Sequence, residues 1–293
     1  MAEPELLIEA QAELGESPVW DPVAGCLLWA DLYAPAIESY RLSDGKRQRW
    51  PLPETLGAFG RCTDGRLIVA MRSGIYRFEP NSEALDLICC PYGEPKAGTR
   101  FNDGKVAPNG RFVIGTMDEQ HKSRPLGCFY SVDSNGQVDR ISQDLIVANG
   151  LAWSPDGRRV HFSDTRRDTL YVADYCLESG EIYHPRVMAV TDPDLHGRPD
   201  GGATDNAGGY WSAGVFGGVL NYWDHHGQLA RQVRLPCPGP TMPCFGGPDM
   251  KTLFVTTLRK GLTPSALAAA PLSGSVFALE VEVPGVPVAA FGG

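Results

Sequence analysis

The sequence predicts an all-β fold, a six-bladed β-propeller with four-stranded blades that uses residues 1–293 as one domain. A frame of strand, turn and strand recurs six times, and its copies lie roughly 40 to 50 residues apart, which is the length of a propeller blade. No helical period of three to four residues persists over a comparable stretch. The chain has 293 residues, and closed all-β folds often use such a length as one unit.

The repeated frame is clearest in residues 149–164. There a short strand around Leu151 leads into the turn Pro155-Asp156-Gly157, and a second strand of alternating character follows. Similar copies occupy residues 16–31, 102–115 and 200–213, and weaker copies occupy residues 58–70 and 245–256. A third strand is visible at residues 74–78, 127–132, 169–173 and 275–279, and usually a fourth. A β-sandwich is the alternative fold, but a sandwich has no reason to repeat one frame six times.

The composition is that of an ordinary globular protein, with 43% hydrophobic and 21% charged residues. The formal net charge is −9 and no block of Lys and Arg occurs, so we expect neither nucleic acid nor a membrane surface as a partner. We find no signal peptide, and no window reaches the roughly 20 apolar residues of a transmembrane helix. The eight cysteines show no C-x-x-C spacing. We therefore expect a cytoplasmic protein with reduced cysteines.

Aligning the six frames on their turns places one residue of each blade at an equivalent point, just ahead of its first strand. In a propeller the first strand of each blade lines the central channel, so these residues face one another at one mouth. In chain order they are Glu16, Gly57, Asn102, Asn149, Asp200 and Met242. Their two carboxylates and two amide carbonyls favour a hard cation such as Ca²⁺, Mg²⁺ or Mn²⁺, with Zn²⁺ less favoured.

A turn-forming role is the alternative for these residues, because Asn and Asp before a strand often close a turn by bonding their own backbone. That interpretation suits each Asn or Asp taken singly. It does not suit Glu16, since Glu is a poor turn residue, and the symmetric set therefore predicts a metal site. The same reasoning predicts that Asp31 and Asp164, at the ends of second strands, cap turns near this mouth.

Longer motifs surround the equivalent residues. They read Gly-Glu-Ser-Pro-Val-Trp at 15–20, Arg-Phe-Asn-Asp-Gly-Lys-Val at 100–106, Gly-Thr-Met at 115–117, Asn-Gly-Leu-Ala-Trp-Ser at 149–154, Pro-Asp-Gly at 199–201 and Cys-Phe-Gly-Gly at 244–247. Over nearly the whole chain they resemble the signatures of the senescence marker protein/regucalcin/gluconolactonase family. The resemblance implies a six-bladed propeller with one divalent metal ion, which hydrolyses the lactone of a sugar acid.

The resemblance assigns the metal ligands. It implies that Glu16, Asn149 and Asp200 bind the ion, which is one of Ca²⁺, Mn²⁺, Mg²⁺, Zn²⁺ or Fe²⁺. A divalent ion with open coordination positions polarises a carbonyl and lowers the pKa of bound water. Asp200 is also placed to accept the proton of the attacking water, so we expect it to be the catalytic general base.

The resemblance assigns substrate contacts to three further residues. Arg100 and Asn102 belong to one motif, and we expect Arg100 to stabilise the developing oxyanion or the product carboxylate. In the family a Glu shortly after Gly-Thr-Met holds sugar hydroxyls, and here either Glu119 or Gln120 takes that place. The polar connection 118–127 begins at this point, and we expect it to act as a lid.

These observations lead us to expect a hydrolase of carboxylic ester bonds, a lactonase that converts an aldonolactone such as a glucono- or pentonolactone to the free acid. Two alternatives stay open: a propeller esterase or lactonase for other esters, and a calcium-binding regulatory protein without enzymatic activity. The expected partner is a small sugar lactone, and the expected state is a monomer or a weak dimer.

Overall fold

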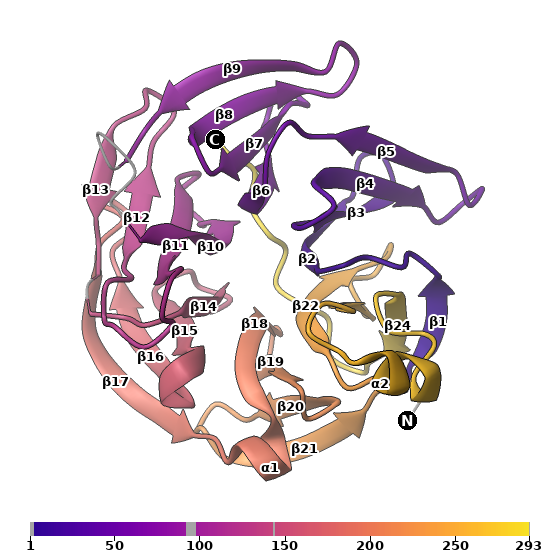
Figure 1. Ribbon diagram of the computed structural model, residues 1–293. Coiled ribbons are helices and arrows are strands. Elements are labelled where there is room, and N and C mark those ends of the chain that lie inside the picture. Colours follow the sequence, from indigo (N-terminus) through magenta and orange to yellow (C-terminus); the bar gives the residue numbers. More distant parts are fainter. Residues whose placement is uncertain (1–2, 92–97, 143, 293) are drawn as a thin grey trace.

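The strands of the described residues form six sheets arranged around a central axis (Figure 1). The computed structural model describes residues 3–91, 98–142 and 144–292. Each sheet has four strands, and in five of the six the strands follow one another in chain order from the axis outwards. This is the six-bladed β-propeller predicted from the repeated frame, including the two blades that carry the weaker copies.

The blades are numbered in chain order, and their strands are given from the axis outwards. Blade 1 contains β2 (Gly15–Asp21), β3 (Cys26–Asp31), β4 (Ala36–Arg41) and β5 (Arg47–Pro51). Blade 2 contains β6 (Leu56–Arg61), β7 (Leu67–Met71), β8 (Gly74–Glu79) and β9 (Ala84–Cys89). Blade 3 contains β10 (Thr99–Val106), β11 (Phe112–Asp118), β12 (Phe129–Val132) and β13 (Val138–Arg140).

The second half of the chain continues the pattern. Blade 4 contains β14 (Ala148–Trp153), β15 (Arg159–Asp164), β16 (Thr169–Tyr175) and β17 (Ile182–Val190). Blade 5 contains β18 (Arg198–Thr204), β19 (Tyr210–Val215), β20 (Val219–Trp223) and β21 (Leu229–Arg234). Blade 6 contains β22 (Pro240–Gly246), β23 (Thr252–Thr257), β24 (Val276–Glu280) and β1 (Glu5–Ile8). The short helices η1 (Thr165–Arg167), α1 (Pro193–His196) and α2 (Pro264–Ala269) lie between strands.

Burial decreases from the axis to the rim of each blade. Every residue of β3 and of β7 is buried, whereas β5 is exposed over most of its length and β9 over half of it. Strands covered on both faces lose the alternation of a half-exposed strand and become apolar runs, such as Leu67-Ile68-Val69-Ala70.

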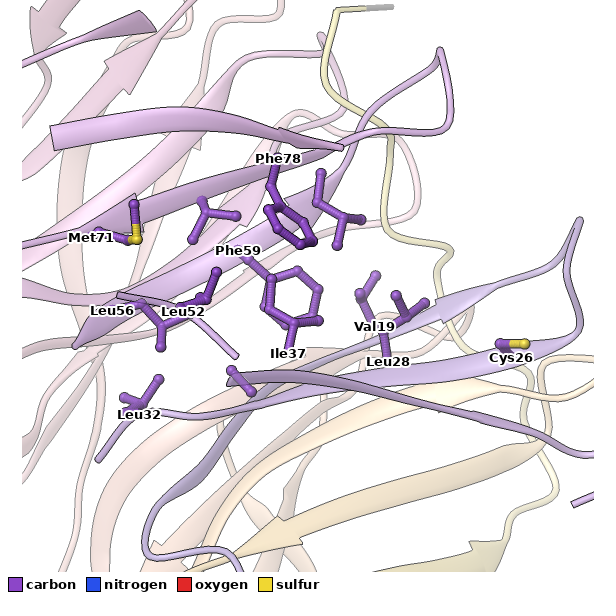
Figure 2. Close-up of a cluster of buried hydrophobic side chains, with 13 residues drawn as sticks. Val19, Cys26, Leu28, Leu32, Ile37, Leu52, Leu56, Phe59, Met71 and Phe78 are labelled. Atoms are coloured by element: carbon purple, nitrogen blue, oxygen red, sulfur yellow. The ribbon is translucent and has the colours of Figure 1, made fainter. Parts of the chain in front are cut away.

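Neighbouring blades pack through apolar faces, as Figure 2 shows for blades 1 and 2. Val19, Leu28 and Ile37 of blade 1 meet Phe59 and Phe78 of blade 2, and all five side chains are buried. The hydrophobic core is therefore distributed around the ring as layers between blades. This packing fixes the inner strands relative to one another, and so positions whatever residues those strands carry at the channel.

Blade 6 is closed by the beginning of the chain. Strand β1 pairs antiparallel with β24, with Glu5 opposite Ala278 and Leu6 opposite Phe277. The repeated frame did not predict this pairing, since the sixth copy shows no fourth strand of its own after residue 279. Closure by β1 covers an edge of β24 that would otherwise expose unpaired backbone groups.

The last residues of the chain, 284–292, cross the end of the channel opposite the predicted metal mouth, and we call this segment the strap (Figure 1). Its backbone forms hydrogen bonds with three blades at this end of the channel. Val286 N donates to Thr204 O of blade 5 at 3.0 Å, and Phe291 N donates to Arg61 O of blade 2 at 2.7 Å. Gly292 N donates to Gly110 O of blade 3 at 3.1 Å. The strap thus ties blades 5, 2 and 3 together across the base.

The remaining global features agree with the composition. All eight cysteines are free, as expected for reduced thiols. Among the described residues, none of the helices has the length and apolar character needed to cross a bilayer.

Candidate functional site

The predicted ring of residues lies on the inner strands at a recurrent irregularity of the backbone. In each of the six blades the register between the first and second strand shifts at this point, for example between Glu16 and Val19, and between Asn149 and Ala152. A β-bulge inserts one residue and re-aims the neighbouring side chains, and bulges are common beside active sites. The six shifts explain how residues of buried strands reach the channel mouth.

The mouth contains a cavity of about 150 Å³, which we call the main cavity. Five of the predicted site residues line it: Glu16, Arg100, Asn102, Asn149 and Asp200. The structure therefore brings together side chains from blades 1, 3, 4 and 5 that are far apart in the sequence.

A second cavity of about 120 Å³ adjoins the first, and we call it the side cavity. The two share Leu32, Gly57 and Arg100 as walls. Glu119, the remaining predicted residue, lines the side cavity, whereas the alternative Gln120 is exposed and lines neither cavity. Of the two alternatives, Glu119 alone lines a cavity, and its contact with substrate stays a prediction.

A chain of hydrogen bonds orients the polar side chains of the main cavity. Arg100 Nη1 donates to Asn102 Oδ1 at 3.2 Å, and Asn102 Nδ2 donates to Asn149 Oδ1 at 3.2 Å. Asn149 Nδ2 in turn donates to Thr165 Oγ1 at 2.8 Å. These bonds fix the amide oxygen of Asn149 on the side of Asn102 and keep the Arg100 guanidinium beside the cluster.

The two predicted carboxylate ligands lie beside one another, Asp200 buried and Glu16 half-buried. Burial, followed by repulsion from Asp200, raises the pKa of Glu16 well above its usual value. Burial, followed by repulsion from Asp103, raises the pKa of Asp200 to about 8, although Arg100 and a hydrogen bond from Asn149 oppose the shift. Ionised carboxylates at such a place need a nearby cation. The donor set of two carboxylates and one amide oxygen fits a hard divalent ion.

Among the described residues no three His, Cys, Asp or Glu side chains gather in a group that could hold a metal ion. The predicted set has only two carboxylates and takes its third oxygen from Asn149.

Asp103 is a site residue that the sequence analysis missed. Its side chain is buried and lines the main cavity. Asp103 Oδ2 accepts a bond from Leu151 N at 3.2 Å, while Oδ1 has no hydrogen-bond partner among the described residues. The buried ammonium of Lys105 donates to Gly202 O at 2.7 Å and counters part of the negative charge. The sequence held one signal for this residue: Asp103 and Lys105 are charged, although their strand is expected to line the channel.

The second strands end in residues that cap turns at the same mouth. In the turn after β3, Asp31 Oδ1 accepts from Tyr33 N at 3.2 Å and Ala34 N at 3.1 Å. After β15, Asp164 Oδ1 likewise accepts from Arg166 N at 3.2 Å. The prediction that Asp31 and Asp164 cap turns is confirmed.

The connection 118–127, expected as a lid, folds around Asp118. The carboxylate of Asp118 accepts from Gln120 N at 3.2 Å and forms an ion pair with Arg124 at 2.8 Å. Within this connection Glu119 and Lys122 line the cavities. The rest of the connection is held beside them by the buried Asp118, and a lid movement stays a prediction.

The residues that directly follow the second strands form a second ring. All six line one of the two cavities; they are Leu32, Arg72, Glu119, Thr165, Phe216 and Leu258. Glu119 Oε1 accepts from Arg72 Nη1 at 2.6 Å, and this bond is the main cause that lowers the pKa of Glu119. Sequence analysis missed Arg72, because its importance follows from the neighbouring blade and not from its own motif.

The fold and the mouth together define a six-bladed propeller with a polar, carboxylate-bearing channel entrance. Residues 14–259 match the family described as SMP-30/Gluconolactonase/LRE-like region. The chain belongs to this family.

Individual relatives cover almost all of the chain. It is 38% identical to a 6-deoxy-6-sulfogluconolactonase of Pseudomonas putida, over 98% of each chain. It is 32% identical to an L-arabinolactonase of Azospirillum brasilense, over 98% of this chain and 95% of the relative. Among solved structures, the calcium-binding protein regucalcin of Agrobacterium tumefaciens superposes with a TM-score of 0.92 at 27% identity, over 99% of this chain and 97% of that one.

Proposed function

We propose that this chain hydrolyses the lactone of a sugar acid to the free acid, with one divalent cation held by Glu16, Asn149 and Asp200. The observation that carries the proposal is the buried Asp200 and half-buried Glu16 carboxylates beside an oriented amide oxygen in the main cavity. The names of the Pseudomonas putida and Azospirillum brasilense relatives, both sugar lactonases, support the substrate class.

In the proposed reaction the cation, Asp200 and Arg100 each have a separate role. When bound, the cation supplies Lewis acidity toward the lactone carbonyl. A carboxylate oxygen of Asp200 accepts the proton of the water whose oxygen bonds to the carbonyl carbon. The bond between that carbon and the ring oxygen then breaks, and the ring oxygen leaves as a hydroxyl after taking the proton that Asp200 accepted. Arg100, fixed by Asn102, stabilises the negative charge that develops on the carbonyl oxygen.

The lining of the cavities favours a polyhydroxylated substrate over an apolar ester. Arg100, Asn102 and Glu119 offer both donors and acceptors around the space beside the carboxylates. Sugar hydroxyls donate and accept hydrogen bonds and so match such a lining, whereas an apolar ester would leave these groups unpaired.

The test is a panel of aldonolactones of pentoses and hexoses, assayed by acid release after removal of metals and again with Ca²⁺, Mn²⁺, Mg²⁺, Zn²⁺ or Fe²⁺ added. We expect hydrolysis above the spontaneous rate with at least one metal, and none after chelation. Calcium binding without hydrolysis of any lactone would favour the calcium-binding regulatory alternative instead. Hydrolysis confined to apolar esters would favour the esterase alternative.

A further inference from the structure

The channel mouth carries as many cationic as acidic side chains, although the chain as a whole has a net charge of −9. Four cationic side chains line the main and side cavities: Arg72, Arg100, Lys122 and Arg166. Four carboxylates face them: Glu16, Asp103, Asp200 and Glu119. The two sets balance, so the mouth lacks the negative charge of the protein as a whole and repels an anion less than the rest of the surface does.

Among the described residues Arg72 alone of these four cations forms an ion pair, and the two at the rim, Lys122 and Arg166, are exposed. Lys122 and Arg166 are exposed and form no ion pair there, whereas the nearby Arg124 and Arg167 pair with Asp118 at 2.8 Å and Asp164 at 3.3 Å. Asp118 and Asp164 therefore do not neutralise Lys122 and Arg166 at the rim of the mouth.

Arg72 is the cation best placed to hold a specific group. It follows β7 in blade 2, and its backbone N donates to Thr55 O at 3.1 Å, which fixes the base of the side chain. Nη1 donates to Glu119 Oε1 at 2.6 Å. In the part of the chain that the structure describes, Nε and Nη2 have no acceptor, and the guanidinium can bind a second oxyanion through them.

The side cavity is the right size and in the right place for such an oxyanion. At about 120 Å³ it admits a small group, and it adjoins the main cavity along Arg100 and Gly57. A Cβ at Gly57 would lie 2.6 Å from Phe101, so this ring position has space only for glycine. A substrate with its reacting carbonyl beside Arg100 can thus extend its far end toward Arg72.

We propose that the substrate carries an oxyanion, a sulfonate or a phosphate, at the end farthest from the lactone carbonyl, and that Arg72 binds it. This inference rests on the proposed lactonase function and specifies its substrate class. A neutral lactone gives the free donors of Arg72 only weak acceptors, whereas an oxyanion forms charge-assisted hydrogen bonds with them.

The test compares glucono-lactone with its 6-sulfo and 6-phospho derivatives, which share one ring and differ in the far substituent. We expect the wild-type protein to have the higher kcat/KM on a charged derivative. In Arg72→Gln, the ratio of kcat/KM for the charged over the uncharged lactone should fall about 10- to 100-fold, mainly through KM, as for the loss of a hydrogen bond to a charged group. The derivative with the larger fall identifies the group as sulfonate or phosphate.

Arg158→Gln is the matched control, because it removes the same charge from an exposed turn at the opposite end of blade 4. Its charged-over-uncharged ratio should equal that of the wild type. An equal loss on all three lactones in Arg72→Gln would overturn the inference, since Arg72 would then only position Glu119. A wild-type preference for the uncharged lactone would also overturn it while leaving the lactonase function standing. If no lactone is hydrolysed, the proposed function itself fails.

Discussion

Asp200 is the residue on which metal binding and proton transfer both depend in the proposed function. Asp200→Asn keeps the size of the side chain but removes one of the two ligand charges and the base. We expect the affinity for Ca²⁺ or Mn²⁺, measured by titration calorimetry, to fall at least about tenfold, and kcat to fall about 10²- to 10⁴-fold. Asp44→Asn, on an exposed turn far from the mouth, is the control of equal charge. Full activity of Asp200→Asn would contradict the assignment.

His161 tests a different residue-scale effect, the cost of burying an ionisable group. Its ring is buried, stacks on Tyr210 at 4.9 Å, and its Nδ1 has no hydrogen-bond partner among the described residues. Burial, followed by repulsion from Arg159, lowers the pKa of His161 to about 4. The unfolded chain therefore takes up a proton below about pH 6.5, while the folded protein takes it up only near pH 4.

The titration of His161 therefore leaves the free energy of unfolding unchanged above about pH 6.5. As the pH falls from there toward 4, it lowers the free energy of unfolding by at most about 3 kcal/mol. His161→Phe removes the titration and keeps an aromatic ring against Tyr210. Denaturant unfolding at pH 7 and pH 4.5 should show a smaller decrease for the variant than for the wild type. An identical decrease in both proteins would mean that His161 is protonated in the folded state.

At the scale of the elements, the repeated frame predicts most of the fold because it is local. A strand, a Pro-Asp-Gly type turn and the next strand are neighbours in the chain, so six copies predict six blades. The pairing of β1 with β24 joins residues about 270 positions apart. Residues 5–8 carry no motif that predicts the strand with which they pair. The pairing follows only from closure of the ring of blades.

The closing strand gives a stability prediction with an internal control. Ile8 is 6% exposed and packs in the apolar layer between blades 6 and 1, whereas Leu6 on the same strand is 44% exposed. Ile8→Ala should lower the free energy of unfolding by about 2 to 4 kcal/mol, because it leaves a cavity, and Leu6→Ala by less than about 1 kcal/mol. Equal effects of the two substitutions, measured by urea unfolding, would show that β1 does not seal the blade.

At the scale of the whole molecule, the ring symmetry explains which parts of the site were predictable. Glu16, Asn149 and Asp200 occupy one point of the repeat, so counting residues from each turn is enough to place them at one mouth. Asp103 lies one residue beyond that point, and the pair formed by Arg72 and Glu119 joins adjacent blades. Such contacts depend on backbone bulges and on blade packing, which a linear repeat does not encode.

The strap is the feature that belongs to no single blade. Phe291 is 1% exposed, packs in the apolar layer between blades 2 and 3, and lies under the guanidinium of Arg77 at 5.7 Å. Because the strap crosses the base while the carboxylates lie at the mouth, the two ends of the channel should respond separately to substitution. Phe216, by contrast, lines the main cavity and is 58% exposed.

Phe291→Ala should therefore lower the free energy of unfolding by about 3 to 5 kcal/mol, the usual cost of removing a buried aromatic ring. At temperatures well below its melting point, the kcat of this variant should equal that of the wild type, because the mouth keeps its geometry. Phe216→Ala should change the free energy of unfolding by less than about 1 kcal/mol. Thermal unfolding and steady-state kinetics on both variants check this separation. A large fall in kcat for folded Phe291→Ala would show that the strap transmits strain along the inner strands to the carboxylates.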